Sequence, residues 1–400
     1  MRQFLDGNTA IARGALAAGC DFFAGYPITP ATPILLTMMR ELPRAGGIAI
    51  QGEDEIASLG FCIGAAMTGR RAFTATSGPG ISLYSENIGL AIMGEVPLVI
   101  VDVQRMGPAT GGATTAAQGD AQFIRWCTSG GYPVIVLCPA TVADCYTLTL
   151  CAFDLAERFR CPVFLLADKE VASTMDTVDM GSVSPVAVRE RATAPNECLY
   201  LPCDYPSADQ NVPMSPFGGP HLLRFTTSTH DERGYLTKDP DKVERLNRHL
   251  IAKIEEHAHE IERVRIDAHP EENADVLLVS YGITARAMDE AVRQARGAGR
   301  AVSALTLLSL WPLPERALRE AMRGIRQVVV AELNDGQIRR EVERLACGGA
   351  HVAGAHVTGA HVAGAHVTGA HVAGAHVVGV HRLDGELITP GQILDTGGLR

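Results

Sequence analysis

The sequence lacks any cysteine pattern typical of a metal site. Its ten cysteines are scattered, none forms a C-x-x-C pair, and the nearest approach along the chain is Cys198 to Cys203. Iron–sulfur and zinc sites need clustered thiolates, so we expect no metal site on this chain. Most of the cysteines lie in apolar runs, which is typical of a cytosolic protein whose thiols are reduced and packed as small apolar side chains.

Long apolar runs and basic clusters are also missing. The longest apolar stretches, such as residues 97–101 and 133–137, have the length of a strand and fall far short of a membrane span. A formal net charge of −10, without a Lys/Arg cluster, argues against a nucleic-acid partner. Asp6 and Asn8 interrupt any signal-peptide core at the N-terminus. We therefore expect a cytoplasmic protein that binds neither a membrane nor nucleic acid.

The sequence does contain an alternation of strand and helix patterns over its first 170 residues. Each predicted strand is apolar on both faces and precedes a helix, with glycines and prolines between elements. This pattern indicates a doubly wound α/β fold, in which helices cover both faces of a parallel sheet. The predicted strands are residues 21–25, 48–51, 72–75, 98–103, 134–138 and 163–167, and the helices are 9–18, 31–42, 54–69, 81–93 and 142–159.

A length of 400 residues, 46% of them hydrophobic, predicts two or three domains. We place the first at residues 1–175 and a connector, rich in Pro, Ser and Gly, at 176–274. An amphipathic helix is predicted within the connector at 240–266, because Asp239 suits the N-cap and Pro240 the first helical position. A second α/β unit follows at 275–400, with strands at 276–280, 302–307 and 327–331 and helices at 284–297, 315–323 and 336–346.

Residues 350–379 are six tandem copies of Ala-His-Val-X-Gly. A five-residue period keeps its histidines on one face neither in a helix nor in a strand, because five residues advance a helix by about 500° and an odd period alternates faces in a strand. A His-rich tract that binds metal is the less favoured interpretation. We interpret the repeat as a tolerated insertion in a surface loop.

Three polar residues fall at the ends of predicted strands or at the starts of the helices after them. They are Thr29, Glu55 and Arg105. Ligands of doubly wound sheets bind at the carboxyl ends of the strands, so these side chains could hold an anionic substrate beside a nitrogen heterocycle. Taken singly, each has an ordinary structural interpretation: a turn residue, a helix cap and a surface ion pair. Glu53 and Asp54 are interpreted as helix-start charges.

Seven segments resemble the alpha subunit of 2-oxoacid:ferredoxin oxidoreductases, in the family's order and through nearly the whole chain outside the repeat. They are GYPITP (25–30), GEDEIASLGFCIGAAMTGRRAFTATSGPG (52–80), EVPLVIVDVQRMGPATGG (95–112), QGDAQFIRW (118–126), HDERGYLTKDP (230–240), LWPLPE (310–315) and AELNDGQIRREV (331–342). Two positions depart from the family pattern: Met106 stands where glycine is common, and Asp335 where an apolar residue is expected.

The resemblance implies thiamine diphosphate chemistry. Residues 1–175 would form the doubly wound domain that holds the cofactor's pyrimidine ring, and 275–400 a domain similar to the transketolase C-terminal domain. Glu55 matches the glutamate that hydrogen-bonds the pyrimidine nitrogen and so promotes formation of the reactive carbanion of the thiazolium ring. Arg105 matches an arginine near the substrate carboxylate, and Thr29 a hydroxyl donor of the same pocket.

The family also accounts for what is missing. The chain has no Gly-Asp-Gly followed by a suitably spaced Asn, the motif that would bind magnesium and the diphosphate, and no cluster-binding cysteines. The family carries magnesium and a [4Fe-4S] cluster on a separate beta subunit. The resemblance therefore implies a hetero-oligomer of alpha–beta pairs that decarboxylates a 2-oxoacid to an acyl-CoA and passes electrons to ferredoxin.

The favoured substrate is 2-oxoglutarate, and branched-chain or aromatic 2-oxoacids are alternatives. A non-catalytic scaffold subunit is a second alternative, although the presence of Glu55 speaks against it. A nicotinamide-dependent enzyme on a Rossmann fold ranks last, because Gly25-Tyr26-Pro27 stands where G-x-G-x-x-G would be required after the first strand.

Overall fold

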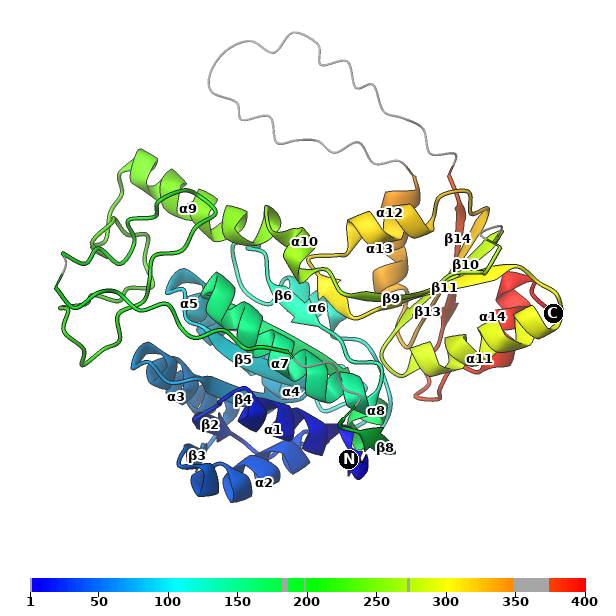
Figure 1. The fold of residues 1–400 in the computed structure, drawn as a ribbon, viewed down its shortest axis with the longest axis horizontal. Coiled ribbons are helices and arrows are strands. Elements are labelled where there is room, and N and C mark those ends of the chain that lie inside the picture. The colour runs from blue at the N-terminus through cyan, green and yellow to red at the C-terminus, as the bar shows by residue number, and fades with distance from the viewer. Residues whose placement is uncertain (1, 182–185, 198, 272–273, 348–373) are drawn as a thin grey trace, which may run out of the picture.

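The computed structural model describes residues 2–181, 186–197, 199–271, 274–347 and 374–400. Two sheets, each with helices on both faces, lie side by side, and the connector runs along the outer side of the first (Figure 1). The predicted mixed α/β architecture with mainly parallel sheets is confirmed. None of the helices in these ranges is long and apolar enough to cross a membrane.

The first sheet has the strand order β12-β6-β7-β5-β4-β2-β3, and every neighbouring pair is parallel except β12–β6. Its central strands are buried on both faces, which explains their valine, isoleucine and leucine content. Their bounds are β2 (Phe22–Gly25), β3 (Ile48–Gln51), β4 (Ala72–Thr76), β5 (Leu98–Gln104), β6 (Ile135–Leu137), β7 (Pro162–Asp168) and β12 (Ser309–Trp311).

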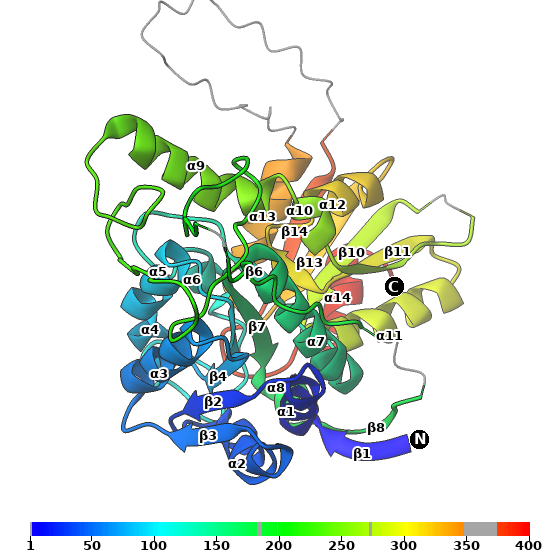
Figure 2. The ribbon, with the colours of Figure 1, turned by 60° about the vertical axis from the view of Figure 1, so that its left-hand side comes forward.

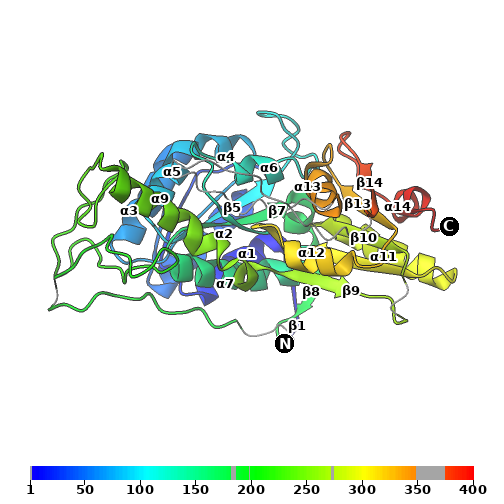
Figure 3. The same cartoon turned by 90° about the horizontal axis from the view of Figure 1, so that it is seen from above.

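Helices cover the two faces of this sheet in two groups (Figure 3). One group is α1 (Gly7–Ala17), α2 (Thr32–Glu41), α7 (Val142–Phe159) and α8 (Lys169–Ser173). A short 3-10 turn, η1 (Pro43–Ala45), follows α2. The other group is α3 (Glu55–Met67), α4 (Pro79–Leu83), α5 (Ser85–Met93) and α6 (Ala121–Arg125). The helix predicted at 81–93 is thus two helices. They separate at Tyr84, whose buried hydroxyl lies 3.0 Å from the Thr74 hydroxyl and fixes that residue against the sheet.

The second sheet has the strand order β14-β13-β10-β11-β9, parallel except for the edge strand β9. Its strands are β9 (Val264–Asp267), β10 (Val276–Tyr281), β11 (Val302–Leu307), β13 (Gln327–Glu332) and β14 (His376–His381). Helices α11 (Thr284–Gly297) and α14 (Pro390–Gly397) pack on one face, and α12 (Glu315–Ala321) and α13 (Gln337–Ala346) on the other.

The helix predicted at 240–266 is shorter than expected. Helix α9 (Pro240–Glu255) begins as predicted, with the Asp239 side chain accepting hydrogen bonds from the first turn. It ends at Glu255, and α10 (Ala258–Ile261) and strand β9 follow. The extension to 266 is wrong because Val264 and Ile266 alternate with charged residues in an edge strand that pairs with β11.

Two further pairings were not predicted from local pattern. Strand β1 (Arg2–Asp6) pairs antiparallel with β8 (Met175–Asp179) (Figure 2). Strand β12 crosses from the second α/β unit to the edge of the first sheet. Each of the two large hydrophobic clusters contains residues from both sheets. The two α/β units are therefore packed together, and the second unit completes the first sheet.

The repeat at 350–379 lies mostly outside the described residues. Its last copy does not: His376 to Gly379 belong to β14, which pairs in parallel register with β13. The predicted C-terminal bound of the insertion, residue 379, therefore lies too far along the chain, because β14 already begins at His376. Val377, Val378 and Val380 are β-branched, which favours a strand there.

Between the two units lies a set of buried polar side chains that we call the joint network: Gln118, Asp168, Tyr281, Glu332 and Asn334. Gln118 donates to Asp168 Oδ2 at 3.0 Å, and Asn334 donates to the Gln118 carbonyl at 2.7 Å. Glu332 accepts the first backbone N–H groups of α13 at 3.0 and 2.9 Å. Every buried side-chain nitrogen and oxygen of these five residues has a partner within the described chain. This network fixes the second unit against the carboxyl ends of the first sheet.

Candidate functional site

The site is arranged around the tight turn of residues 77–80, between β4 and α4. A Cβ on Gly80 would overlap Thr76 Oγ1 and lie 2.9 Å from the Glu55 side chain. Gly78 has φ +40°, and its Cα faces the Arg105 side chain, with 3.5 Å from a Cβ position to Arg105 Cγ. Glycine is required at Gly80 because side chains approach its backbone closely, and at Gly78 because its φ is positive. Glu55 and Arg105 therefore lie against the same turn.

Glu55 is the first residue of α3 and is almost fully buried, at 7% exposure. The Asp54 side chain caps the helix by accepting the Ala57 N–H at 2.7 Å, which confirms the interpretation of Asp54 as a helix-start charge. Glu55 is left free of that role and accepts no hydrogen bond from the described part of the chain. A buried carboxylate without a donor is costly, so this position is suited to a ligand that donates a hydrogen bond.

Arg105 follows β5 and is 6% exposed. Its Nη1 donates to the backbone carbonyl of Thr29 at 2.5 Å, so the structure brings these two predicted residues together. The contact uses the Thr29 backbone, and the Thr29 side chain itself lies at the surface. The rest of the guanidinium remains available, since Nε has no partner within the described residues.

Unpaired buried polar atoms gather around this turn. We call the residues that carry them the turn cluster: Thr76, Ser77, Asp102, Gln104, Arg105 and Asp120. Each has one buried nitrogen or oxygen without a hydrogen bond in the described chain, and all lie at or just beyond the carboxyl ends of β4 and β5. Because an unmade buried hydrogen bond costs about 1–3 kcal/mol, such a concentration marks a place where bound molecules complete the bonding.

Asp102 and Asp120 were not predicted as site residues. Asp102 is fully buried on β5 and accepts the Gly78 N–H at 3.2 Å, while Asp120 precedes α6. Burial, and next the Asp120 charge, raise the pKa of Asp102 well above its ordinary value. Burial also raises the pKa of Asp120, to about 6, against the opposing effect of Arg105. A single acid inside an otherwise apolar strand, as in Leu98–Gln104, is the sequence signal that could have identified Asp102.

A cavity of about 400 Å³ opens beside the turn. Gly78, Pro79 and Asp120 line it from the first unit, and Asn334 and Arg382 line it from the second. The site thus lies where the carboxyl ends of the first sheet face the second unit, the location expected for a ligand in a doubly wound fold.

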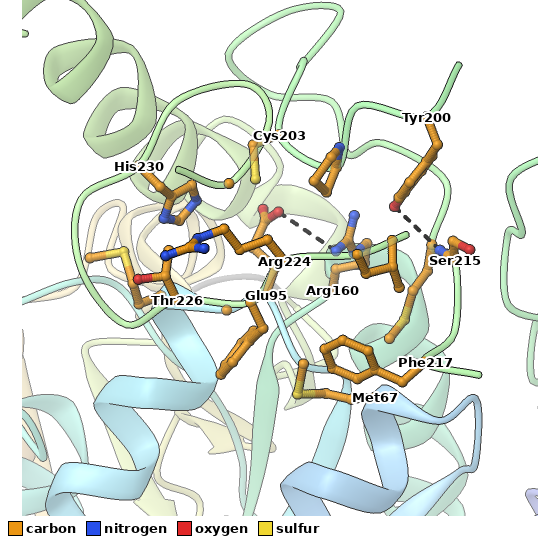
Figure 4. Close-up of a pocket in the computed structure, with 17 residues that line it drawn as sticks. Met67, Glu95, Arg160, Tyr200, Cys203, Ser215, Phe217, Arg224, Thr226 and His230 are labelled. Atoms are coloured by element: carbon orange, nitrogen blue, oxygen red, sulfur yellow. Dashed lines mark hydrogen bonds and ion pairs between the residues drawn. The ribbon is translucent and has the colours of Figure 1, made fainter. Parts of the chain in front are cut away.

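A separate, smaller cavity of about 60 Å³ lies under the connector (Figure 4). Neither this cavity nor the one of about 400 Å³ is lined by any of the three predicted residues. Glu95 beside the smaller cavity is bound by Lys253 Nζ at 2.9 Å, by His249 Nε2 and by Arg160 at 3.8 Å. Burial acts to raise the pKa of Glu95, but Lys253 and Arg160 outweigh it and hold that pKa well below the ordinary value. With its charges paired, this cluster holds α9 and the connector to the first unit.

Comparison with known proteins identifies the family. Residues 13–248 match the thiamine diphosphate-binding domain of pyruvate flavodoxin/ferredoxin oxidoreductases, and 274–372 match core domain II of pyruvate:ferredoxin oxidoreductase. The chain belongs to this oxidoreductase family. The first match includes Thr29, Glu55, Arg105 and the turn cluster, so the site described here lies in the thiamine diphosphate-binding domain.

Several members of the family resemble the chain over most of their length. The 2-oxoglutarate synthase subunit KorA of Methanocaldococcus jannaschii is 43% identical over 348 residues, which cover 86% of this chain and 91% of that protein. The ketoisovalerate oxidoreductase subunit VorB of Methanothermobacter marburgensis is 34% identical over 342 residues, which cover 85% and 89%.

Solved structures agree with this assignment. The 2-oxoglutarate:ferredoxin oxidoreductase of Magnetococcus marinus, solved with 2-oxoglutarate, coenzyme A and succinyl-CoA bound, superposes with a TM-score of 0.86 at 28% identity. The superposition covers 99% of this chain and 64% of that one. A split-gene transketolase superposes with a TM-score of 0.50 at 13% identity, which shows a shared fold.

The residues around the turn suit thiamine diphosphate. The buried Glu55 carboxylate lacks a donor, and the bare Cα of Gly80 leaves its face open. By contrast, no group of three or more His, Cys, Asp or Glu side chains within the described ranges is placed to hold a metal ion.

Proposed function

We propose that this chain is the alpha subunit of a 2-oxoglutarate:ferredoxin oxidoreductase. The reaction converts 2-oxoglutarate, coenzyme A and two oxidised ferredoxins into succinyl-CoA, carbon dioxide, two reduced ferredoxins and one proton. The observation that carries the proposal is the 43% identity to a 2-oxoglutarate synthase subunit along almost the whole length of both chains. Acting on a branched-chain 2-oxoacid is the second candidate, supported by the 34% identity to the ketoisovalerate subunit.

Thiamine diphosphate, when bound, supplies the electron sink for loss of carbon dioxide. Glu55 accepts a hydrogen bond from the pyrimidine ring, a role supported by its burial and its lack of a protein donor. Arg105 binds a substrate carboxylate through the guanidinium nitrogens that Thr29 does not occupy. The exposed Thr29 hydroxyl donates to the substrate. The buried surroundings of Glu55 and Arg105 strengthen their interactions because they exclude water.

A beta subunit supplies magnesium, the diphosphate-binding residues and the [4Fe-4S] cluster, and delivers the electrons to ferredoxin. The missing diphosphate motif and the missing cysteine clusters of this sequence support that division. A cytoplasmic hetero-oligomer of alpha–beta pairs follows, in which neither chain has a complete site.

The outer face of α3 is the surface that we assign to the beta subunit. Ile56 and Phe61 are 49% and 46% exposed there, and a Cβ on Gly60 or Gly64 would have nothing within 4 Å. Glu55, at the start of this helix, would hold the pyrimidine ring of the cofactor, and the chain that holds the diphosphate would then lie close to the same helix. The glycines allow that chain to approach closely.

Co-purification tests this surface. Phe61→Asp should weaken binding to the co-expressed beta subunit by about 30-fold or more, since it places a charge in an apolar contact. Ile266→Asp is the matched control, because Ile266 is 51% exposed on the edge strand of the other sheet. Equal binding by the two variants would remove α3 from the interface.

Activity is tested by 2-oxoacid-dependent reduction of a low-potential dye, with coenzyme A and thiamine diphosphate present. The chain alone, the alpha–beta pair and variant pairs are compared over a panel of 2-oxoacids. Glu55→Gln should lower kcat about 1,000-fold, the size expected for loss of an acid–base group. Glu53→Gln is the matched control, since it removes the same charge from an exposed position two residues away and should keep full activity.

The outcomes separate the alternatives. The proposal is supported if the wild-type alpha–beta pair is active, the chain by itself is inactive, and kcat/KM is highest for 2-oxoglutarate. A preference for 2-oxoisovalerate would support the branched-chain alternative. Full activity of Glu55→Gln would contradict the role of Glu55 and favour a scaffold subunit.

A further inference from the structure

Two carboxyl groups of the turn cluster lie next to each other behind Arg105. Asp102 Oδ2 and Asp120 Oδ2 are both buried, and neither has a hydrogen bond from any other described residue. The two side chains are within hydrogen-bonding reach of each other. Two carboxylates cannot donate to each other, so these two oxygens are satisfied only when one of them carries a proton.

The surrounding contacts decide which one carries it. Asp102 is 0% exposed and its Oδ1 accepts the Gly78 N–H at 3.2 Å. Asp120 is less buried, faces the cavity of about 400 Å³, and donates its backbone N–H to Gln104 Oε1 at 3.1 Å. The group more removed from water is the one that is harder to ionise, so Asp102 keeps the proton and donates it to Asp120.

We propose that Asp102 and Asp120 form a one-proton carboxyl pair that positions Arg105 and sets how strongly Arg105 attracts the substrate carboxylate. The pair connects the end of β5, the start of α6 and the turn at Gly78, which are the elements that hold Arg105 in place. The part concerning the substrate rests on the proposed function; the shared proton does not.

The charges around the pair determine how its protonation affects substrate binding. Arg105 lies beside both carboxyls, Glu55 lies on the other side of the turn, and Asp335 and Arg382 face Asp120 across the cavity. Asp335 is paired with Arg340 and Arg382 with Asp384, so Arg105 is the cation most directly affected. An ionised Asp120 competes with the substrate carboxylate for Arg105, and a neutral Asp120 does not.

Protonation of Asp120 should therefore tighten substrate binding. Because burial raises the pKa of Asp120 to about 6, KM for 2-oxoglutarate should fall as the pH drops through about 6. The open cavity lets the proton exchange with solvent. Burial holds the pKa of Asp102 well above its ordinary value, so Asp102 holds its proton the more firmly of the two.

Substitutions in the alpha–beta complex distinguish positioning from a general structural role. Asp120→Asn should lower KM about fivefold at pH 7.5 and abolish its change near pH 6, since a charge near Arg105 is removed. Asp102→Ala should move the midpoint to higher pH, because Asp120 loses its donor. Asp102→Asn should restore the midpoint to near 6, because an amide N–H can donate in place of the acid. Damage to the fold alone would lower kcat in every variant and leave the midpoint unchanged.

Infrared spectroscopy of the full-length chain, without partner or substrate, tests the shared proton itself. The difference spectrum between wild type and Asp102→Asn at pH 7.5 should contain the carbonyl stretch of one protonated carboxyl. Asp154→Asn is the matched control and should show none, since Arg189 and the Arg189 N–H hold the pKa of Asp154 below its ordinary value against the effect of burial.

Absence of the protonated-carboxyl band, or an unchanged KM profile in Asp120→Asn, would overturn the proposal. Failure of the proposed function would be seen elsewhere. If Arg105→Lys left the KM for every 2-oxoacid unchanged while the band was present, the assignment of Arg105 to the substrate would be wrong and the shared proton would stand.

Discussion

The turn cluster and the joint network are two sets of buried polar side chains of similar composition and location. Each includes a glutamine and acidic side chains, and each lies at or near the carboxyl ends of parallel strands. They differ in their hydrogen bonding. The five residues of the joint network are fully paired, whereas each residue of the turn cluster has an unpaired buried atom within the described chain.

The difference shows why burial of polar groups does not by itself identify a site. The joint network uses its polar groups to hold two α/β units together, and its bonds are complete without a ligand. The turn cluster, which includes Arg105, is incomplete, and so is Glu55 beside it. Unmade hydrogen bonds carry a free-energy cost in the isolated chain that a bound cofactor, substrate or water can remove.

The largest expected contrast is between two glycines. Gly282 has φ +57°. In Gly282→Ala, the new Cβ would overlap Asp168 Oδ2 and lie 2.5 Å from Gln118 Nε2, and both of these side chains are held by the joint network. The free energy of unfolding should fall by about 4 kcal/mol or more. In Gly80→Ala, the new Cβ meets Thr76 and Glu55, and the Glu55 carboxylate has no partner that prevents it from moving. The unfolding free energy should fall by less than about 2 kcal/mol, while kcat/KM of the complex falls about 100-fold.

Urea unfolding of the full-length chain and the dye assay of the complex measure the two effects. A folded, stable Gly282→Ala would show that the joint network is loose. Full activity of Gly80→Ala would show that the position of Glu55 at the turn is unimportant for catalysis.

A comparison of two buried glutamines, one from each set, should give an effect of intermediate size. Gln118 and Gln104 are both 0% exposed. Gln118 donates to Asp168 and the Tyr281 carbonyl and accepts from the Leu333 N–H at 3.0 Å. Gln118→Leu should cost about 3–4 kcal/mol of unfolding free energy, because it leaves several buried groups unpaired. Gln104→Leu should cost about 1–2 kcal/mol, because it loses one hydrogen bond, from the Asp120 N–H to Gln104 Oε1, while the Gln104 Nε2 has no partner to lose.

The measurement is again urea unfolding, with the unfolding slope checked for each variant so that the two free energies are comparable. Equal losses for the two leucine variants would mean that Gln104 has partners in solution that complete its bonding.

Local sequence pattern predicted the central elements of both sheets because their apolar runs and helix periods are strong. It also placed Thr29, Glu55 and Arg105 at one end of the first sheet, since the carboxyl ends of parallel strands share an edge. The edge pairings were not predictable in this way. Strand β12 is three residues long, and only tertiary contact with β6 decides that it joins the first sheet.

The hydrogen-bond partners of individual side chains also could not be predicted from the sequence. The contact between Arg105 and the Thr29 backbone, rather than its hydroxyl, depends on how two loops meet in space. Gln118 lies in a motif that the family shares, but its role in the joint network requires the second unit to be in place. Asp102 is the exception, because a lone acid in an apolar strand is visible in the sequence.

The smallest and most specific test uses two buried serines, each 0% exposed. Ser280, beside the joint network on β10, donates to the Ala331 carbonyl at 2.9 Å. Ser280→Ala should therefore cost about 1 kcal/mol of unfolding free energy, the net value of one hydrogen bond. The Ser77 hydroxyl has no partner in the described chain, so Ser77→Ala should leave stability unchanged or raise it by up to about 1 kcal/mol. If the Ser77 hydroxyl bonds to the cofactor, Ser77→Ala should instead lower the unfolding free energy once thiamine diphosphate and the beta subunit are bound. Urea unfolding of the complex with and without thiamine diphosphate measures this change. A loss for Ser77→Ala in the isolated chain would show that ordered water already completes the turn cluster, and that its unpaired atoms do not wait for a ligand.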